Sequence, residues 1–149
     1  MLSTTSRYAL RALGRLARAF EKELVLGRDL ADQADVPSNY LSKILLSLRN
    51  EGIVEATRGT GGGYRLGRAP EDVRLIEIVE LFEGSQSEKM CLLDARSNCS
   101  PEHPCTAHLG WEKVQSIYLD FLNSTTLADI ARVPNGHAGK EEAWDVQNR

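Results

Sequence analysis

A three-residue break, Asp35-Val36-Pro37, separates two short segments with helical patterning, residues 27–34 and 38–50. Asp35 and Pro37 end the first segment, and Ser38 is placed to cap the second. The leucines of the second segment fall on one face, and the opposite face is polar and contains no acidic residue. Two helices joined by so sharp a turn are typical of a helix-turn-helix.

The polar start of the second segment resembles the part of a recognition helix that reaches base edges. We therefore expect contacts to bases or phosphates from Ser38, Asn39, Tyr40 and Lys43. Simple exposure to solvent is the alternative interpretation of this face.

An amphipathic helix is predicted over residues 3–20, because Ser3 and the threonines after it offer N-caps and apolar residues recur at helical spacing. Arginines form a stripe on another face of this helix. A solvated face explains Arg15 and Arg18 equally well, whereas Arg7 at the helix start is better placed to reach a phosphate.

Two short strands, residues 53–56 and 63–66, are predicted around a glycine-rich tip. Neither a Gly-Lys-Ser/Thr sequence nor a helix follows the glycines, which argues against a phosphate-binding loop. A glycine-rich hairpin that carries Arg58 after a helix-turn-helix is typical of a wing whose tip approaches the minor groove. An ordinary hairpin turn is the alternative.

The rest of the chain begins with a predicted amphipathic helix from Leu75 to Phe82, packed under the wing and ended by Gly84. After a loop, the chain becomes helical again from Cys105, with apolar and aromatic residues at every third or fourth position. This stripe is too long to cover so small a domain, which favours a dimerisation helix over packing on its own core. Residues 134–149 are predicted to form a loose tail.

The net charge of −3 is the sum of a basic N-terminal half and an acidic C-terminal half. Residues 1–68 carry eleven basic and seven acidic side chains, whereas residues 69–149 carry seven and fourteen. The basic half predicts a polyanionic partner such as double-stranded DNA. No apolar run is long enough to span a membrane, and three cysteines gathered in one loop favour a reducing compartment, so we expect a cytoplasmic protein.

Three cysteines and a histidine follow one another in that loop with the spacing Cys91-x7-Cys99-x5-Cys105-x2-His108. The loop is short and stiffened by prolines, so the four side chains can converge. Thiolates and imidazole suit an iron–sulfur cluster or zinc, and they do not suit magnesium or calcium. Zinc ligands usually come in closely spaced pairs, so the spacing favours a cluster, with zinc and unligated thiols as alternatives.

An enzyme would have to use these same residues. Cys105 and His108 could pair as nucleophile and base, but nothing in the sequence suggests a pocket or an oxyanion hole. We therefore predict no catalytic activity.

The chain resembles the Rrf-two family of bacterial winged-helix repressors over residues 1–133, and most closely its IscR-like branch of iron–sulfur cluster regulators. Four segments carry the resemblance: Ser6-Arg7-Tyr8-Ala9-Leu10, Tyr40-Leu41-Ser42-Lys43-Ile44-Leu45, Arg58-Gly59-Thr60-Gly61-Gly62-Gly63-Tyr64-Arg65-Leu66, and the three cysteines followed by a long helix. This resemblance implies a homodimer whose two recognition helices enter successive major grooves of a pseudo-palindromic operator.

The resemblance also implies that Cys91, Cys99 and Cys105 are cluster ligands. His108 matches the fourth ligand of the IscR-like branch, and the first helix offers no acidic residue, histidine or cysteine to a partner subunit, so a [2Fe–2S] cluster is expected. Seven residues separate the first two cysteines here, whereas five do so in that branch. This departure leaves a [4Fe–4S] cluster as the alternative.

The predicted fold is therefore mainly α-helical with a small β-wing: a winged helix-turn-helix followed by a long C-terminal dimerisation helix. We expect a DNA-binding domain over residues 1–84, a cluster-binding loop over 85–108 and a dimerisation region over 105–133, before the tail. The predicted function is an iron–sulfur transcriptional regulator, a repressor by resemblance, whose cluster state modulates operator binding. A zinc-stiffened winged-helix interaction module without a sensing role is the alternative.

Overall fold

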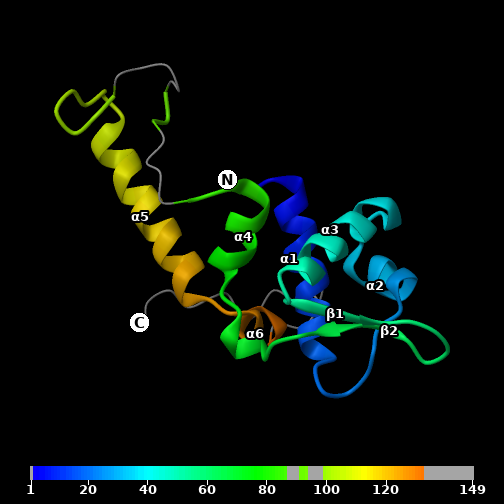
Figure 1. Ribbon diagram of the computed structural model, residues 1–149. Coiled ribbons are helices and arrows are strands. Elements are labelled where there is room, and N and C mark those ends of the chain that lie inside the picture. Colours follow the sequence, from blue (N-terminus) through cyan, green and yellow to red (C-terminus); the bar gives the residue numbers. More distant parts are fainter. Residues whose placement is uncertain (1, 87–90, 94–98, 133–149) are drawn as a thin grey trace, which may run out of the picture.

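The computed structural model describes residues 2–86, 91–93 and 99–132 (Figure 1). Its elements are α1 (Thr4–Arg18), α2 (Gly27–Ala34), α3 (Ser38–Asn50), β1 (Val54–Thr57), β2 (Gly63–Leu66), the short 3-10 helix η1 (Pro70–Asp72), α4 (Leu75–Glu83), α5 (His108–Ser124) and α6 (Leu127–Ala131). The described chain is mainly α-helical with one two-stranded sheet, so the predicted fold class is confirmed. None of the helices in these ranges is long and apolar enough to cross a membrane.

Helix α1 lies at the centre of the winged-helix unit, because α2, α3, α4, α6 and β2 all pack against it. Its first turn is fixed by the Ser3 hydroxyl, which accepts a hydrogen bond from the Ser6 backbone N–H at 3.1 Å. The core around α1 is aliphatic, and its most completely buried members include Leu13, Leu16, Leu30, Leu45, Leu48 and Ile78. Because each such side chain contributes about 1.5–3 kcal/mol on burial, this core holds the turn and the wing in place.

The turn between α2 and α3 is as sharp as predicted, but its cap differs. Asp35 ends α2 in the left-handed conformation with a φ of 52°, which Asp tolerates better than most residues. Helix α3 begins at Ser38 itself, with Pro37 in the capping position and no side-chain capping bond. The prediction that Ser38 caps this helix is therefore wrong: Pro37 already supplies the extended backbone of a cap, and the Ser38 side chain is left exposed.

Strands β1 and β2 form the wing, an antiparallel hairpin whose register runs from Val54 opposite Leu66 to Thr57 opposite Gly63. Strand β1 starts one residue later than expected, because the Ile53 backbone N–H still bonds to the carbonyl of Leu48 and closes α3. At the tip, a Cβ on Gly62 would collide with the carbonyl oxygen of Thr57, so the tight turn requires glycine there.

Helix α4 packs mainly against α1 and α5, and not under the wing as the sequence pattern suggested. Helix α5 starts at His108, three residues after the expected start at Cys105. The helix begins late because Cys105 belongs to the loop in which the cysteines converge, and its carbonyl accepts the His108 N–H in a turn before the helix. Residues 134–149, predicted to form a tail, lie outside the described residues.

The short helix α6, which was not predicted, returns the chain to α1 and buries Leu127 and Ala128. Backbone hydrogen bonds from Leu75 to Thr125 at 3.0 Å and from Leu127 to Val73 at 2.9 Å tie this return to the start of α4. Within α5, Leu122 near its C-terminal end is the one buried residue. Helix α5 is thus anchored at that end, and the rest of it projects away from the winged-helix unit (Figure 1).

Candidate metal centre and nucleic-acid interface

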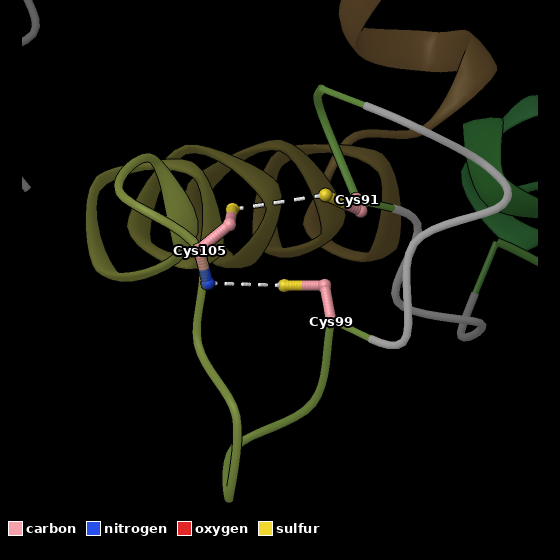
Figure 2. A group of neighbouring side chains, drawn as sticks. All are labelled: Cys91, Cys99 and Cys105. Atoms are coloured by element: carbon pink, nitrogen blue, oxygen red, sulfur yellow. Dashed lines mark hydrogen bonds between the residues drawn. The ribbon is translucent and has the colours of Figure 1, made fainter.

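The three cysteine side chains converge just before the first turn of α5 (Figure 2). Their Sγ atoms all lie within 4.8 Å of one another, and Cys91 and Cys105 are 3.7 Å apart. The backbone N–H of Cys105 points toward the Sγ of Cys99 at 3.5 Å. The convergence expected from the sequence is confirmed, whereas the role of these thiols as metal ligands stays a prediction.

His108 joins the group through its Nδ1 atom, which lies 3.2 Å from the Sγ of Cys99. Because His108 is the first residue of α5, its imidazole is positioned by the helix itself. Two close contacts thus occur among the four donor groups, Cys91 with Cys105 and Cys99 with His108, and the Cys99 sulfur also lies within 4.8 Å of the other two sulfurs. The other histidine of the loop, His103, is exposed, and its backbone N–H bonds to the Ser100 hydroxyl.

These separations fit metal coordination. Two thiolates on one tetrahedral ion, with metal–sulfur bonds of about 2.3 Å, lie about 3.8 Å apart. The Cys91–Cys105 separation of 3.7 Å matches that spacing, and the Cys99–His108 pair is slightly closer at 3.2 Å. The donor set thus fits two adjacent metal centres, one beside Cys91 and Cys105 and the other beside Cys99 and His108, whereas the three thiols alone are close enough to share one ion.

Several neighbouring groups shift the pKa of the Cys99 thiol, and they do so in opposite directions. The backbone N–H of Cys105 lowers the pKa of the Cys99 thiol, but desolvation and the thiols of Cys105 and Cys91 together raise it by more. The net result is a pKa above the ordinary value for cysteine. Since a thiolate is the form that binds metal, metal binding at these thiols would release protons and would be favoured by higher pH.

The start of α3 is open to solvent, as a DNA-contacting surface has to be. The residues selected from the sequence, Ser38, Asn39, Tyr40 and Lys43, are all exposed. No acidic residue occurs in α3, so this face presents hydroxyl, amide and ammonium donors without a competing negative charge. Their contacts to DNA remain a prediction.

The two predicted arginine contacts lie on different elements. Arg7 is exposed in the first turn of α1, where its guanidinium donates to the Thr4 hydroxyl at 3.4 Å. Arg58 is exposed at the wing, directly after the last residue of β1. The wing, α2 and α3 lie on the side of the molecule opposite α5 (Figure 1). The structure therefore separates the expected DNA-reading elements from the cysteine site.

Two residues of α1 that the sequence pattern did not single out connect this helix to the turn and to α3. The Nη2 atom of Arg11 donates to both the backbone oxygen and the carboxylate Oδ2 of Asp35, at 2.6 and 2.7 Å. The Arg11 guanidinium carbon also lies 5.7 Å from the centroid of the Tyr8 ring, and that ring meets the ring of Tyr40 edge-on at 6.1 Å. A spacing of three residues puts Tyr8 and Arg11 on one helix face, but it does not reveal their distant partners.

Helix α5 presents an apolar face that is largely exposed. Large side chains exposed along it are Leu109, Val114, Ile117 and Phe121. Ile117 is 71% exposed near the middle of the helix. A run of this kind on a projecting helix is typical of a protein–protein contact surface.

The fold defines a winged helix-turn-helix protein, the class whose second helix and wing contact DNA. The family model Rrf2, described as an iron-dependent transcriptional regulator, matches residues 2–133. The chain belongs to the Rrf2 family of transcriptional regulators, which confirms the resemblance found in the sequence and implies DNA binding. The family and its named relatives are regulators, in agreement with the prediction that the protein is not an enzyme.

Individual relatives agree with this assignment. The chain is 36% identical to the regulator IscR of Cereibacter sphaeroides, over 88% of this chain and 86% of that protein. It is 35% identical to the regulator NsrR of Bacillus licheniformis, over 87% of this chain and 90% of that protein. Its structure is similar to that of CymR, the global cysteine regulator of B. subtilis, with a TM-score of 0.74 and 30% identity over 88% of this chain and 95% of that one.

Proposed function

We propose that this regulator binds an iron–sulfur cluster through Cys91, Cys99, Cys105 and His108, and that the state of the cluster changes its affinity for DNA. The observation that carries the proposal is the convergence of three thiols and one imidazole at the start of α5. When bound, the cluster supplies a redox- and oxidant-sensitive link between these four side chains.

The arrangement of the four donors favours a [2Fe–2S] cluster. Such a cluster has two irons, each needing two protein ligands, and the structure offers two close pairs. The description of the Rrf2 family as iron-dependent supports an iron-containing group at this site, of either cluster type. A [4Fe–4S] cluster is the second candidate, because the chain between Cys91 and Cys99 is longer than in the IscR-like branch.

The site can influence DNA binding through α5. Cys105 precedes this helix by three residues and His108 begins it, so loss of the ligand contacts frees the loop and the first helical turn together. A coupling of about 1–3 kcal/mol between the two sites, roughly 5- to 150-fold in affinity, suffices for a switch.

The proposed partner is double-stranded DNA with a pseudo-palindromic operator, bound by a homodimer in the cytoplasm to repress transcription. Ser38, Asn39, Tyr40 and Lys43 contact bases or phosphates in the major groove. Arg58 enters the minor groove, and Arg7 anchors a phosphate. The exposed apolar face of α5 supports dimerisation along this helix, which would set the distance between the two recognition helices.

The first test of this proposal is anaerobic purification of the full chain, followed by a visible spectrum and assays for iron, sulfide and zinc on the same sample. About two irons and two sulfides per chain support the [2Fe–2S] cluster, and about four of each support the larger cluster. A colourless protein that contains one zinc ion under strict exclusion of oxygen contradicts the cluster and supports the zinc-stiffened module.

The second test separates sensing from mere metal binding. Cys99→Ala is compared with the wild type, each with and without its cluster, for binding to a duplex selected by the wild-type protein from a randomised pool. We expect the wild-type affinity to depend on the cluster and the Cys99→Ala affinity to be fixed. If all four samples bind the duplex with equal affinity, the protein still binds DNA, but the proposal that the cluster controls its DNA affinity is wrong.

A further inference from the structure

We propose that Tyr8 and Arg11 of α1 are positioning residues that set the orientation of the DNA-reading end of α3. This inference rests on the proposed DNA-binding function and deepens it, because it assigns two residues outside the helix-turn-helix a part in operator recognition.

Arg11 holds the turn that precedes the recognition helix. The connection between α2 and α3 consists only of Asp35, Val36 and Pro37, so the backbone conformation of Asp35 contributes directly to the angle between the helices. Asp35 has the left-handed backbone conformation, which is unfavourable for a residue with a side chain. A single Arg11 nitrogen binds both its backbone oxygen at 2.6 Å and its carboxylate at 2.7 Å.

Tyr8 contacts the first turn of α3 directly, through the ring of Tyr40. Tyr40 is the third residue of this helix and is 53% exposed, so its own burial does not fix the position of its ring. The ring of Tyr8 meets it in an edge-to-face contact with centroids 6.1 Å apart and planes 65° apart. The Arg11 guanidinium lies over the same Tyr8 ring, so the two contacts form one continuous group from the turn to the helix start.

These contacts lie at the surface, which points to a geometric role more than a stabilising one. The side chains of Arg11 and Asp35 are 43% and 96% exposed, and exposed ion pairs contribute little to folding stability. The buried leucines below already hold α3 in the fold. The contacts of Tyr8 and Arg11 instead fix the orientation of the α3 segment that carries Asn39, Tyr40 and Lys43. Hydrogen bonds to base edges require such precise orientation.

The experiment compares full-length, anaerobically purified wild type with Tyr8→Ala, Tyr8→Phe and Arg11→Ala. Two DNA probes are used: a duplex selected by the wild type from a randomised pool, and a shuffled duplex of the same base composition. Thermal melting is measured for every variant. Arg132→Ala is the charge-matched control for Arg11→Ala, because Arg132 is exposed just after α6, outside the elements expected to contact DNA and outside the apolar face of α5.

We expect Tyr8→Ala to weaken binding to the selected duplex by about 3- to 10-fold, the range of an aromatic pair, and to leave the melting temperature and the shuffled-duplex affinity near the wild-type values. Tyr8→Phe restores binding, because the ring edge and not the hydroxyl makes the contact. Arg11→Ala weakens binding to the selected duplex in the same sense, whereas Arg132→Ala does not.

Three outcomes overturn the inference: unchanged selectivity in Tyr8→Ala and Arg11→Ala, no rescue by Tyr8→Phe, or an equal loss on both duplexes, which identifies a direct phosphate contact. If the wild type itself shows no preference for any selected duplex, the proposed DNA-reading function fails instead. The two failures are therefore distinguishable.

Discussion

The Nδ1 atom of His108 lies 3.2 Å from the Sγ of Cys99, so the first residue of α5 touches the middle cysteine of the loop before it. His108 belongs both to the proposed ligand set and to the helix that presents an exposed apolar face. A change in ligation at this position is therefore a change at the start of a helix, without any relay through other side chains.

Replacement of His108 is the direct test of the fourth ligand. We expect His108→Ala to lose the visible absorption of the cluster, with at least a 10-fold drop in metal retention, because even outer-sphere partners of metal ligands contribute about that much. His103→Ala is the matched control, since His103 is the other, exposed histidine of the same loop. Iron and sulfide contents measured anaerobically decide the matter. Equal iron in both variants would remove His108 from the ligand set.

The wing is tested by Arg58→Ala. Its guanidinium is exposed beside the glycine-rich tip, and we expect its loss to weaken binding to a selected duplex by about 1–3 kcal/mol and to lower the salt dependence by about one unit of slope. Fluorescence anisotropy over a range of salt concentrations measures both quantities. Arg132→Ala removes the same charge from an exposed position after α6 and should leave both unchanged. An Arg58→Ala protein that binds as the wild type does places the wing outside the interface.

The exposed face of α5 is tested by Ile117→Asp. A carboxylate in the centre of a dimer interface is costly to bury, so this variant should sediment as a monomer at concentrations where the wild type is a dimer. The neighbouring change Ser116→Asp introduces the same charge at an exposed polar position and should leave the dimer intact. Sedimentation equilibrium distinguishes the two. A dimeric Ile117→Asp protein means that another surface forms the dimer.

Glu77 gives the folded state a dependence on pH. Burial raises the pKa of its carboxyl, but the hydrogen bond from Arg68 at 2.7 Å, the backbone N–H of Arg74 at 3.0 Å and the two positive charges outweigh burial and hold the pKa below its ordinary value. A group with a lowered pKa in the folded state stabilises the fold above its unfolded-state pKa, and this contribution is lost as the pH falls through the folded-state pKa.

Glu77→Gln should therefore reduce the free energy of unfolding by about 1 kcal/mol near neutral pH, and the difference from the wild type should shrink toward zero in acid. Urea denaturation across the pH range measures it. Glu71→Gln, at an exposed position in η1, is the matched control. A Glu77→Gln deficit that stays constant with pH indicates lost packing and not lost charge.

Local signals in the sequence predicted the helix-turn-helix well. The bounds of α2 and α3 agree with the predicted residue ranges, because Asp35, Pro37 and Gly52 each interrupt a helix by their own backbone preferences. The predicted strand 63–66 agrees as well. The sequence misled where two local signals competed: Ser38 is a good capping residue, but the proline before it already occupies that position.

Features that depend on contacts between distant residues were not predictable in this way. Helix α6 is five residues long, too short for a periodic pattern, although Thr126 and Asp129 form a capping box that could have revealed it. The packing of α4 against α5 and the bond from Arg11 to Asp35 join segments that no spacing rule connects. At the cysteine site the spacing predicted convergence, and only the coordinates show the close contacts of Cys91 with Cys105 and of Cys99 with His108.

Helix α5 is held over its C-terminal half, where Leu122 is buried and Tyr118 packs against the core, so its N-terminal end can move like the end of a lever. Leu122 and the strand-like pairing of Arg74 with Thr126 hold its C-terminal end against the winged-helix unit. Its 17 residues extend about 25 Å from that pivot, so moving His108 sideways by about 2 Å turns the helix by about 5°. If two copies of the chain pair along α5, each subunit contributes one such rotation to the angle between the two winged-helix units. In the proposed dimer, a displacement no larger than a bond length or two at the sulfurs would therefore change the angle at which both recognition helices meet DNA.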